Sequence, residues 1–140
     1  YYFSGERMMT LTEMEKNFRA LADANRLRIL ALVQDAPLCV CQLMAILDIS
    51  QSTVSKHLAI LKGAGLVEEV QRGKRSFYHL ATRFPSELAE AVVKRVLVEL
   101  CNSPELAEGR KLAAFMREYR IETMSAAQNL RQKRHMLRML

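Results

Sequence analysis

The residues with the most reactive side chains in this sequence are its three cysteines. Cys39 and Cys41 are separated by a single residue, and Cys101 follows much later in the chain. Thiolates are soft ligands, so two of them at this spacing could bind a soft metal or metalloid ion. The same pair could instead be small buried hydrophobes, as free cysteines often are. An odd number of cysteines argues against a secreted disulfide framework and favours a reducing, cytoplasmic location.

A second group of candidate residues lies on a helix that the sequence predicts over residues 51–62, with a serine as its N-cap. Small polar side chains gather at its N-terminal end, which is the part of a helix that reaches base edges in the major groove of DNA. Cations further along are expected to contact phosphates. The predicted DNA contacts on this helix are Ser50, Gln51, Ser52, Thr53, Ser55, Lys56 and His57. The other interpretations are a merely solvated helix face and, for His57, a structural role.

A β-hairpin is predicted directly after this helix. Two short runs with strand-like composition, residues 66–70 and 76–80, flank a turn that contains Gly73. Arg72, Lys74 and Arg75 surround that glycine. Three cations on a flexible turn suit the phosphate backbone or a minor groove, so these residues complete the predicted DNA-binding set.

The remaining sequence predicts the helices that would position these side chains. Apolar residues recur at spacings of three and four, and only 5 glycines and 3 prolines leave little material for an all-β fold. The third helix is expected from about Leu38 to Leu47, with both neighbouring cysteines at its start. The apolar stripes are Leu11, Met14, Phe18 and Leu21 in the first helix, and Leu88, Ala91, Val92, Val96 and Leu100 in the helix after the hairpin. The predicted fold class is mainly α with a small β-hairpin, a winged helix-turn-helix.

The distribution of charge supports a local DNA-binding region rather than a uniformly basic protein. The chain has a net charge of +6, but residues 1–109 contain 13 basic and 13 acidic groups. Residues 50–83 carry a net +4 and residues 110–140 a net +6. No apolar run is long enough to span a membrane, so no membrane partner is expected. The sequence has no Gly-rich phosphate loop, no His-Glu-x-x-His and no nucleophile elbow, so we expect no enzymatic activity.

Residues 18–80 resemble the ArsR/SmtB family of bacterial winged-helix repressors. The resemblance is carried by several motifs in the family's order, namely Phe18-Arg19-Ala20-Leu21-Ala22-Asp23, Arg26-Leu27-Arg28-Ile29-Leu30, Ser50-Gln51-Ser52-Thr53-Val54-Ser55-Lys56-His57-Leu58, Gly65-Leu66-Val67 and Phe77-Tyr78-His79-Leu80. It implies a homodimer that pairs through the first helix and the helix after the hairpin. It also implies a double-stranded operator with an inverted repeat, from which the repressor is released when an inducer binds.

Cys39-Val40-Cys41 resembles the Cys-Val-Cys of the family's arsenic, antimony and cadmium sensors. The fuller family motif is Glu-Leu-Cys-Val-Cys-Asp-Leu-Cys, whereas this chain has Pro37 at the leading Glu and Met44 at the third Cys. The resemblance implies As(III) as inducer, with Sb(III) or Cd(II) as alternatives and no organic cofactor. A two-thiol site suits methylarsenite or an arsenite that keeps one oxygen ligand, unless Cys101 supplies a third thiol. Zinc is less favoured, because residues 84–101 contain no histidine.

The spacing of the two cysteines also predicts a mechanism. Residues two apart on a helix diverge, so one ion could bind both thiols only by unwinding the start of the third helix. The helix dipole would favour thiolates there. Two alternatives remain: a redox or reactive-sulfur sensor in which Cys101 pairs with Cys39 or Cys41, and a winged-helix module that binds only proteins.

We expect three segments along the chain. Residues 1–9 are expected to be a tag or a disordered N-terminus, residues 10–103 the DNA-binding and dimerisation domain, and residues 104–140 a C-terminal helical extension. In that extension, Leu112, Phe115, Met116 and Tyr119 are expected to pack on the dimerisation helix or its mate. The basic end is expected to be a loosely ordered solvated helix, or else a contact for DNA flanks, a membrane surface or an acidic partner.

Overall fold

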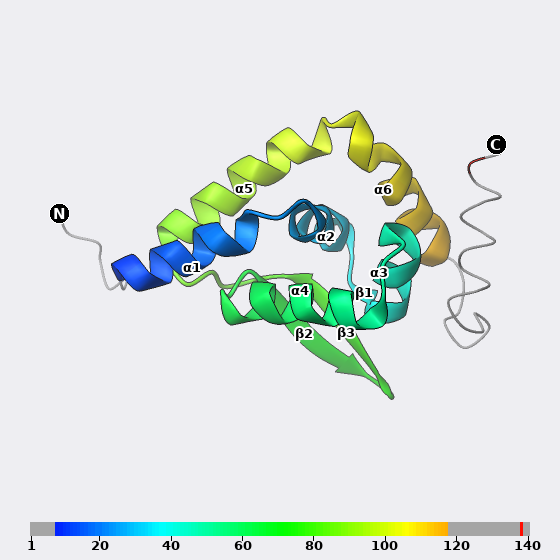
Figure 1. Cartoon of the computed structure of the whole chain (residues 1–140), viewed down its shortest axis with the longest axis horizontal. Coiled ribbons are helices and arrows are strands. Elements are labelled where there is room, and N and C mark those ends of the chain that lie inside the picture. The colour runs from blue at the N-terminus through cyan, green and yellow to red at the C-terminus, as the bar shows by residue number, and fades with distance from the viewer. Residues whose placement is uncertain (1–7, 118–137, 139–140) are drawn as a thin grey trace.

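The computed structural model describes residues 8–117 and Arg138 (Figure 1). Helices and short strands follow one another in the order α1 (Leu11–Leu21), α2 (Ala24–Asp35), β1 (Leu38–Cys39), α3 (Val40–Leu47), α4 (Gln51–Gly63), β2 (Val67–Arg72), β3 (Arg75–Leu80), α5 (Glu87–Cys101) and α6 (Pro104–Arg117). This is the predicted winged helix-turn-helix, with α3 and α4 as the helix-turn-helix and β2–β3 as the wing. The expected N-terminal tag and most of the tail beyond α6 lie outside the described residues.

The sheet differs from the prediction by one strand. The wing hairpin runs from Val67 paired with Leu80 to Arg72 paired with Arg75, and its turn contains Gly73 at a φ of 61°. A third strand, β1, pairs antiparallel with β3, so that the strand order is β1-β3-β2. The sequence placed Leu38 and Cys39 in the third helix, and this was wrong. A strand of two residues has no periodicity of its own and forms only because β3 offers a free edge.

Local capping explains where the helices begin. The Ser50 Oγ accepts a hydrogen bond from the Thr53 backbone N–H at 3.3 Å and starts α4 at the predicted position. Asp48, at a φ of 56°, ends α3 in the left-handed conformation and makes the tight turn before α4. The Asp23 carboxylate likewise accepts from the Asn25 and Arg26 backbone N–H groups and starts α2.

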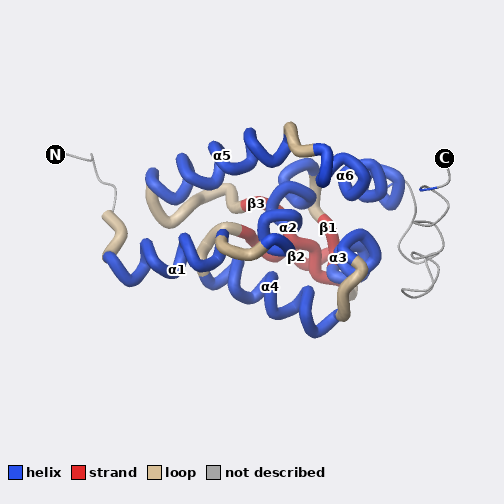
Figure 2. Tube along the Cα trace, turned by 45° about the horizontal axis from the view of Figure 1, so that its top comes forward, coloured by secondary structure: helices blue, strands red, loops and turns tan. Residues whose placement is uncertain are grey.

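The core is centred on α2, which α5 and α6 cover on one side while α4 and the sheet lie on the other (Figures 1 and 2). Its Ile29, Leu30 and Leu32 are at most 1% exposed. From α4, the predicted apolar face Val54, Leu58 and Leu61 is also buried, so the opposite face of α4 is free to meet a partner.

The apolar stripes predicted for α1 and α5 are not the buried faces. Leu11 is 83% exposed and Phe18 50% exposed, whereas α1 buries Asn17 and Ala20. The α5 helix buries Ala89, Val93 and Leu97, and leaves Leu88 and Val98 exposed. Both helices carry apolar residues over more than one face, so periodicity alone could not decide which face packs on α2.

The α6 helix packs on α2 and α3 rather than mainly on α5, which corrects the predicted packing of the extension. Leu112 and Met116 are buried there, and Tyr119 lies outside the described residues. Arg110 forms a two-bond ion pair with Asp35 at 2.9 Å, and Arg117 donates to the carbonyls of Leu32 and Ala36. The end of α2 is thereby held just before β1.

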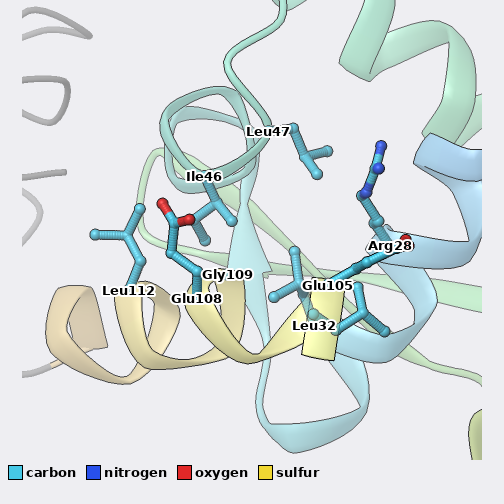
Figure 3. A pocket seen from close by; sticks show the side chains of 9 residues that line it. Arg28, Leu32, Ile46, Leu47, Glu105, Glu108, Gly109 and Leu112 are labelled. Atoms are coloured by element: carbon cyan, nitrogen blue, oxygen red, sulfur yellow. The ribbon is translucent and has the colours of Figure 1, made fainter. Parts of the chain in front are cut away.

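A cavity of about 280 Å³ lies between α2, α3 and α6 (Figure 3). Leu32, Ile46 and Leu112 supply apolar lining, and Arg28, Glu105 and Glu108 supply charged lining. Among the described helices none is long and apolar enough to cross a membrane.

Candidate nucleic-acid interface and thiol site

The N-terminal end of α4 presents a polar, exposed surface. Its side chains at Gln51, Ser52, Ser55 and Lys56 are exposed, and Thr53 is half-buried. The hydroxyl groups are already ordered, because the Ser50 Oγ lies 3.1 Å from the Ser52 Oγ and 2.8 Å from the Thr53 Oγ1. These small polar groups could donate to or accept from base edges without displacing a core contact.

His57 is the exception on this helix. Its side chain is only 12% exposed and faces α2, where its Nδ1 lies 3.3 Å from the Arg26 Nη1 and its Nε2 lies 3.9 Å from Asp23. Burial opposes ionisation of Asp23, but hydrogen bonds from the Arg26 and Asn25 backbones and the nearby charges outweigh it, so its pKa is lowered. This cluster braces α4 against the start of α2.

The wing is tied to α4 by a salt bridge and carries cations at its tip. Glu69 accepts from Lys62 of α4 at 3.0 Å and from Ser76 at 2.8 Å, and these bonds and the ammonium charge lower its pKa. At the tip, Arg72 and Lys74 are exposed, and the Arg72 guanidinium lies 5.6 Å from the centroid of the Phe77 ring. The wing cations are therefore held in a fixed relation to α4.

The thiol pair, Cys39 and Cys41, lies across the junction of β1 and α3. Cys39 is extended, with φ −90° and ψ 169°, and only 3% exposed, while Cys41 is exposed in the first turn of α3. The Cys39 backbone N–H donates to the Gln42 Oε1 at 2.9 Å. The predicted need to unwind a helix between the two thiols was therefore wrong, because Cys39 stands before the helix.

Cys39 is also not the ready thiolate that the helix dipole suggested. Burial raises the pKa of its thiol and outweighs the lowering effects of the Gln42 hydrogen bond and the Arg75 charge. The Cys39 S–H must therefore lose its proton when a soft ion binds to this sulfur.

Cys101 lies at the end of α5, away from the predicted pair. Its S–H donates to the Gln34 Oε1 at 3.6 Å. Within residues 8–117 and Arg138, no group of three or more His, Cys, Asp or Glu side chains could hold a metal ion, and all three cysteines are free. Within one chain, Cys39 and Cys41 share the β1–α3 junction, whereas Cys101 lies on another element, at the end of α5.

Two residues were not connected with the thiol pair from sequence alone: Gln42, and Arg75, which was predicted only as a DNA contact. Gln42 follows Cys39 by three positions, and a polar residue three after a helix start is a signal that could have located the true N-cap. Arg75 approaches Cys41 from the wing, with its Nη1 3.9 Å from the Cys41 Sγ. No sequence signal relates Arg75 to Cys41, because these two residues meet only through the pairing of β1 with β3.

The fold and these surfaces define a winged helix-turn-helix DNA-binding protein, and comparison with known proteins gives its family. The family described as "Bacterial regulatory protein, arsR family" matches residues 23–69. The chain is 40% identical to the arsenical resistance operon repressor of Escherichia coli K12 over 54% of this chain and 65% of that protein. It is 33% identical to the arsenic resistance transcriptional regulator ArsR1 of Pseudomonas putida KT2440 over 68% of this chain and 74% of that protein.

Solved structures agree. HlyU from Vibrio cholerae matches with a TM-score of 0.55 and 31% identity, covering 65% of this chain and 95% of that chain. The chain belongs to the ArsR family of DNA-binding transcriptional regulators. Its relatives are regulators rather than enzymes, which confirms that prediction.

Proposed function

We propose that this protein is a homodimeric repressor that leaves its operator when trivalent arsenic, or a related soft metalloid or metal, binds to Cys39 and Cys41. The observation that carries the proposal is the place of the thiol pair. One thiol is buried beside β3 and the other is exposed at the start of α3, and α3 packs directly on α4. Relatives named for arsenical and cadmium resistance support this class of inducer.

The proposed DNA surface has two parts, the N-terminal end of α4 and the wing. Gln51, Ser52, Thr53 and Ser55 would read base edges from α4, with Ser50 ordering them and Lys56 on a phosphate. Arg72, Lys74 and Arg75 would contact the backbone or a minor groove from the wing. We assign His57 the structural role, since its ring faces Asp23 and Arg26.

The two-thiol site would take arsenite that keeps one oxygen ligand, or methylarsenite. Each S–H would transfer its proton to a hydroxide on arsenic, which leaves as water, so that two As–S bonds replace two As–O bonds and arsenic stays trivalent. Met44 is half-buried on α3 and its thioether is a weak ligand, so we propose no third sulfur within the chain.

Ligand binding would draw the buried Cys39 and the exposed Cys41 toward one ion. Because Cys39 is held by its pairing with Phe77 and by Gln42, this strains the β1–α3 junction. The α3 helix supports α4, so a shift at its first turn biases the molecule away from the DNA-competent arrangement.

The dimer would form through the apolar residues that α1 and α5 leave exposed. Leu11, Phe18 and Leu88 are 83%, 50% and 42% exposed on neighbouring helices. Residues 10–103 would then form the DNA-binding and dimerisation domain, with 104–140 as its extension. Phe18→Glu should dissociate the dimer in sedimentation analysis, whereas the neighbouring surface change Glu15→Gln should not.

The deciding experiment is DNA binding measured with and without arsenite, methylarsenite, cadmium and zinc, using a duplex selected from a random library by the full chain. Arsenite should release the wild type, but neither Cys39→Ser nor Cys41→Ser. Cys101→Ser is the matched control and should respond normally. Release that persists in both single variants would contradict the proposal.

Two other outcomes separate the alternatives. An oxidised protein that shows a disulfide to Cys101 by mass spectrometry, with no response to arsenite, indicates a redox sensor. A chain with no salt-dependent affinity for any duplex indicates a protein-binding module.

A further inference from the structure

Arg75 stands where the thiol pair meets the wing. Its Nη1 lies 3.9 Å from the Cys41 Sγ, which is hydrogen-bond range for a sulfur acceptor. Arg75 is half-buried, whereas its neighbours Lys74 and Arg72 are exposed. One of the three wing cations is thus in contact with Cys41, a residue proposed to bind the inducer.

The backbone strengthens this connection. Cys39 pairs with Phe77 of β3, two residues after Arg75, and Leu38 pairs with Tyr78 (Figure 2 shows β1 beside β3). Residues two apart on a strand share a face, so Arg75 and Phe77 lie on the same side of the wing. Phe77 in turn supports Arg72 at the tip. Both cysteines therefore contact β3, the strand that begins with Arg75: Cys39 contacts it through its backbone and Cys41 through its side chain.

We propose that Arg75 is the positioning residue that couples the thiol pair to the wing, so that occupation of Cys41 changes how the wing holds DNA. This inference rests on the proposed function. It adds a second connection from the thiol pair to the DNA surface, through β3 to the wing, beside the one through α3 to α4. The Arg75 guanidinium lies against the Cys41 sulfur. When that sulfur binds arsenic, the ion and its remaining oxygen take the space beside the Sγ, and Arg75 must move.

The consequence for DNA follows from where Arg75 lies. Arg75 pairs with Arg72 across the turn, and this is the last strand pair before the tip of the wing. A displaced Arg75 changes the spacing of cations that a phosphate or minor groove must match, and a bidentate guanidinium contact is sensitive to such shifts. By linkage, DNA that engages Arg75 must weaken arsenite binding at the thiol pair by the same factor by which arsenite weakens DNA binding.

The first arm of the test measures the ratio of DNA dissociation constants with and without sodium arsenite, on the full chain and the selected duplex. Arg75→Ala is compared with Lys74→Ala, which removes a neighbouring wing cation without a contact to sulfur. Both variants should weaken DNA binding. The ratio should stay within about twofold of wild type in Lys74→Ala and fall at least about fivefold in Arg75→Ala, the scale of a typical coupling. Arg75→Lys should restore only part of it, since an ammonium lacks the planar fork.

Arsenite binding itself is measured by protection of the thiols from alkylation in each variant. At saturating arsenite, protection should be equal in wild type, Arg75→Ala and Lys74→Ala, which shows that the variants still bind arsenite and differ in its effect on DNA. If arsenite releases Arg75→Ala as strongly as wild type, the inference is wrong while the proposed function stands.

The second arm needs no arsenite. In a Cys101→Ser background, the rate at which iodoacetamide modifies Cys41 is followed by peptide mass spectrometry with and without the duplex. DNA should change the reaction rate in the background protein and in Lys74→Ala, because the guanidinium leaves the Cys41 sulfur to contact DNA, and should have no effect in Arg75→Ala. If wild type ignores arsenite but this pattern holds, the inducer proposal fails and the coupling stands. If neither pattern is seen, both are wrong.

Discussion

The N-terminal end of α4 and the thiol pair are both short runs of chemically active residues, yet they are built in opposite ways. On α4, the side chains of Gln51, Ser52 and Ser55 project from one regular helix and are all exposed. In the thiol pair, two cysteines separated by one residue have unlike surroundings, since Cys39 is buried in a strand and Cys41 is exposed on a helix.

The difference shows what each surface depends on. The polar end of α4 needs only a helix with its apolar face buried, so each side chain can act nearly independently. The thiol pair depends on a strand partner and on a wing residue far along the chain, so its two sulfurs are coupled to the rest of the molecule. We expect substitutions on α4 to change DNA affinity alone, and substitutions around the thiols to change stability and coupling together.

The largest effect should come from Gly65, which links α4 to the wing. Gly65 has a φ of 74°, and a Cβ there would lie 2.6 Å from the Pro85 Cγ. Gly65→Ala should lower the free energy of unfolding by about 2–4 kcal/mol, from backbone strain and overpacking. Thermal and urea denaturation would measure it.

Gly73 is the matched control for that change. It also has a positive φ, of 61°, but a Cβ there would meet no atom within 4 Å. Gly73→Ala should therefore cost only about 1 kcal/mol of stability, from backbone strain alone. Equal losses in the two variants would mean that contact with Pro85 does not matter.

A change on α4 should affect DNA affinity without affecting the fold. Gln51→Ala should weaken binding to the selected duplex by about 1–3 kcal/mol and relax its sequence preference, because a base contact is lost. Lys56→Ala should weaken binding to all sequences and reduce the salt slope by about 1. Both should unfold within about 0.5 kcal/mol of wild type, since both side chains are exposed.

The two thiols should differ in their effect on stability. Cys39→Ser places a hydroxyl in a buried apolar site and should cost about 1–3 kcal/mol, whereas Cys41→Ser should stay within about 0.5 kcal/mol. Urea unfolding of the two variants checks this. Similar losses in both variants would mean that burial does not distinguish the Cys39 side chain from the Cys41 side chain.

The smallest effect should be on pH dependence. Burial holds the pKa of Cys39 above its ordinary value of 9.0, so the folded protein keeps this proton where the unfolded chain has lost it. Stability should therefore fall as the pH rises from about 9, the unfolded pKa, through the folded pKa. Below pH 9 this thiol causes no loss of stability. In a Cys41→Ser, Cys101→Ser background, adding Cys39→Ser should flatten this slope. An unchanged slope would assign it to other groups.

Much of the structure of the candidate DNA-binding surface could be predicted from the sequence. Val54, Leu58 and Leu61 recur at helical spacing, and burying that stripe forces the polar residues between them outward. A serine cap at Ser50 and a glycine turn at Gly73 set the ends of the helix and the hairpin by local hydrogen bonding and backbone freedom. Such features are determined within a few residues, so the sequence is sufficient for them.

The thiol pair, its partner Arg75 and the faces of α1 and α5 were decided only by the tertiary structure. Cys39 is a strand residue because β3 pairs with it, and Arg75 meets Cys41 only through that pairing. Which apolar face of α5 is buried depends on α2, because the helix has apolar residues on several sides. Spacing along one chain segment determines what that segment can form, whereas a contact between distant segments depends on which surfaces remain free to pair.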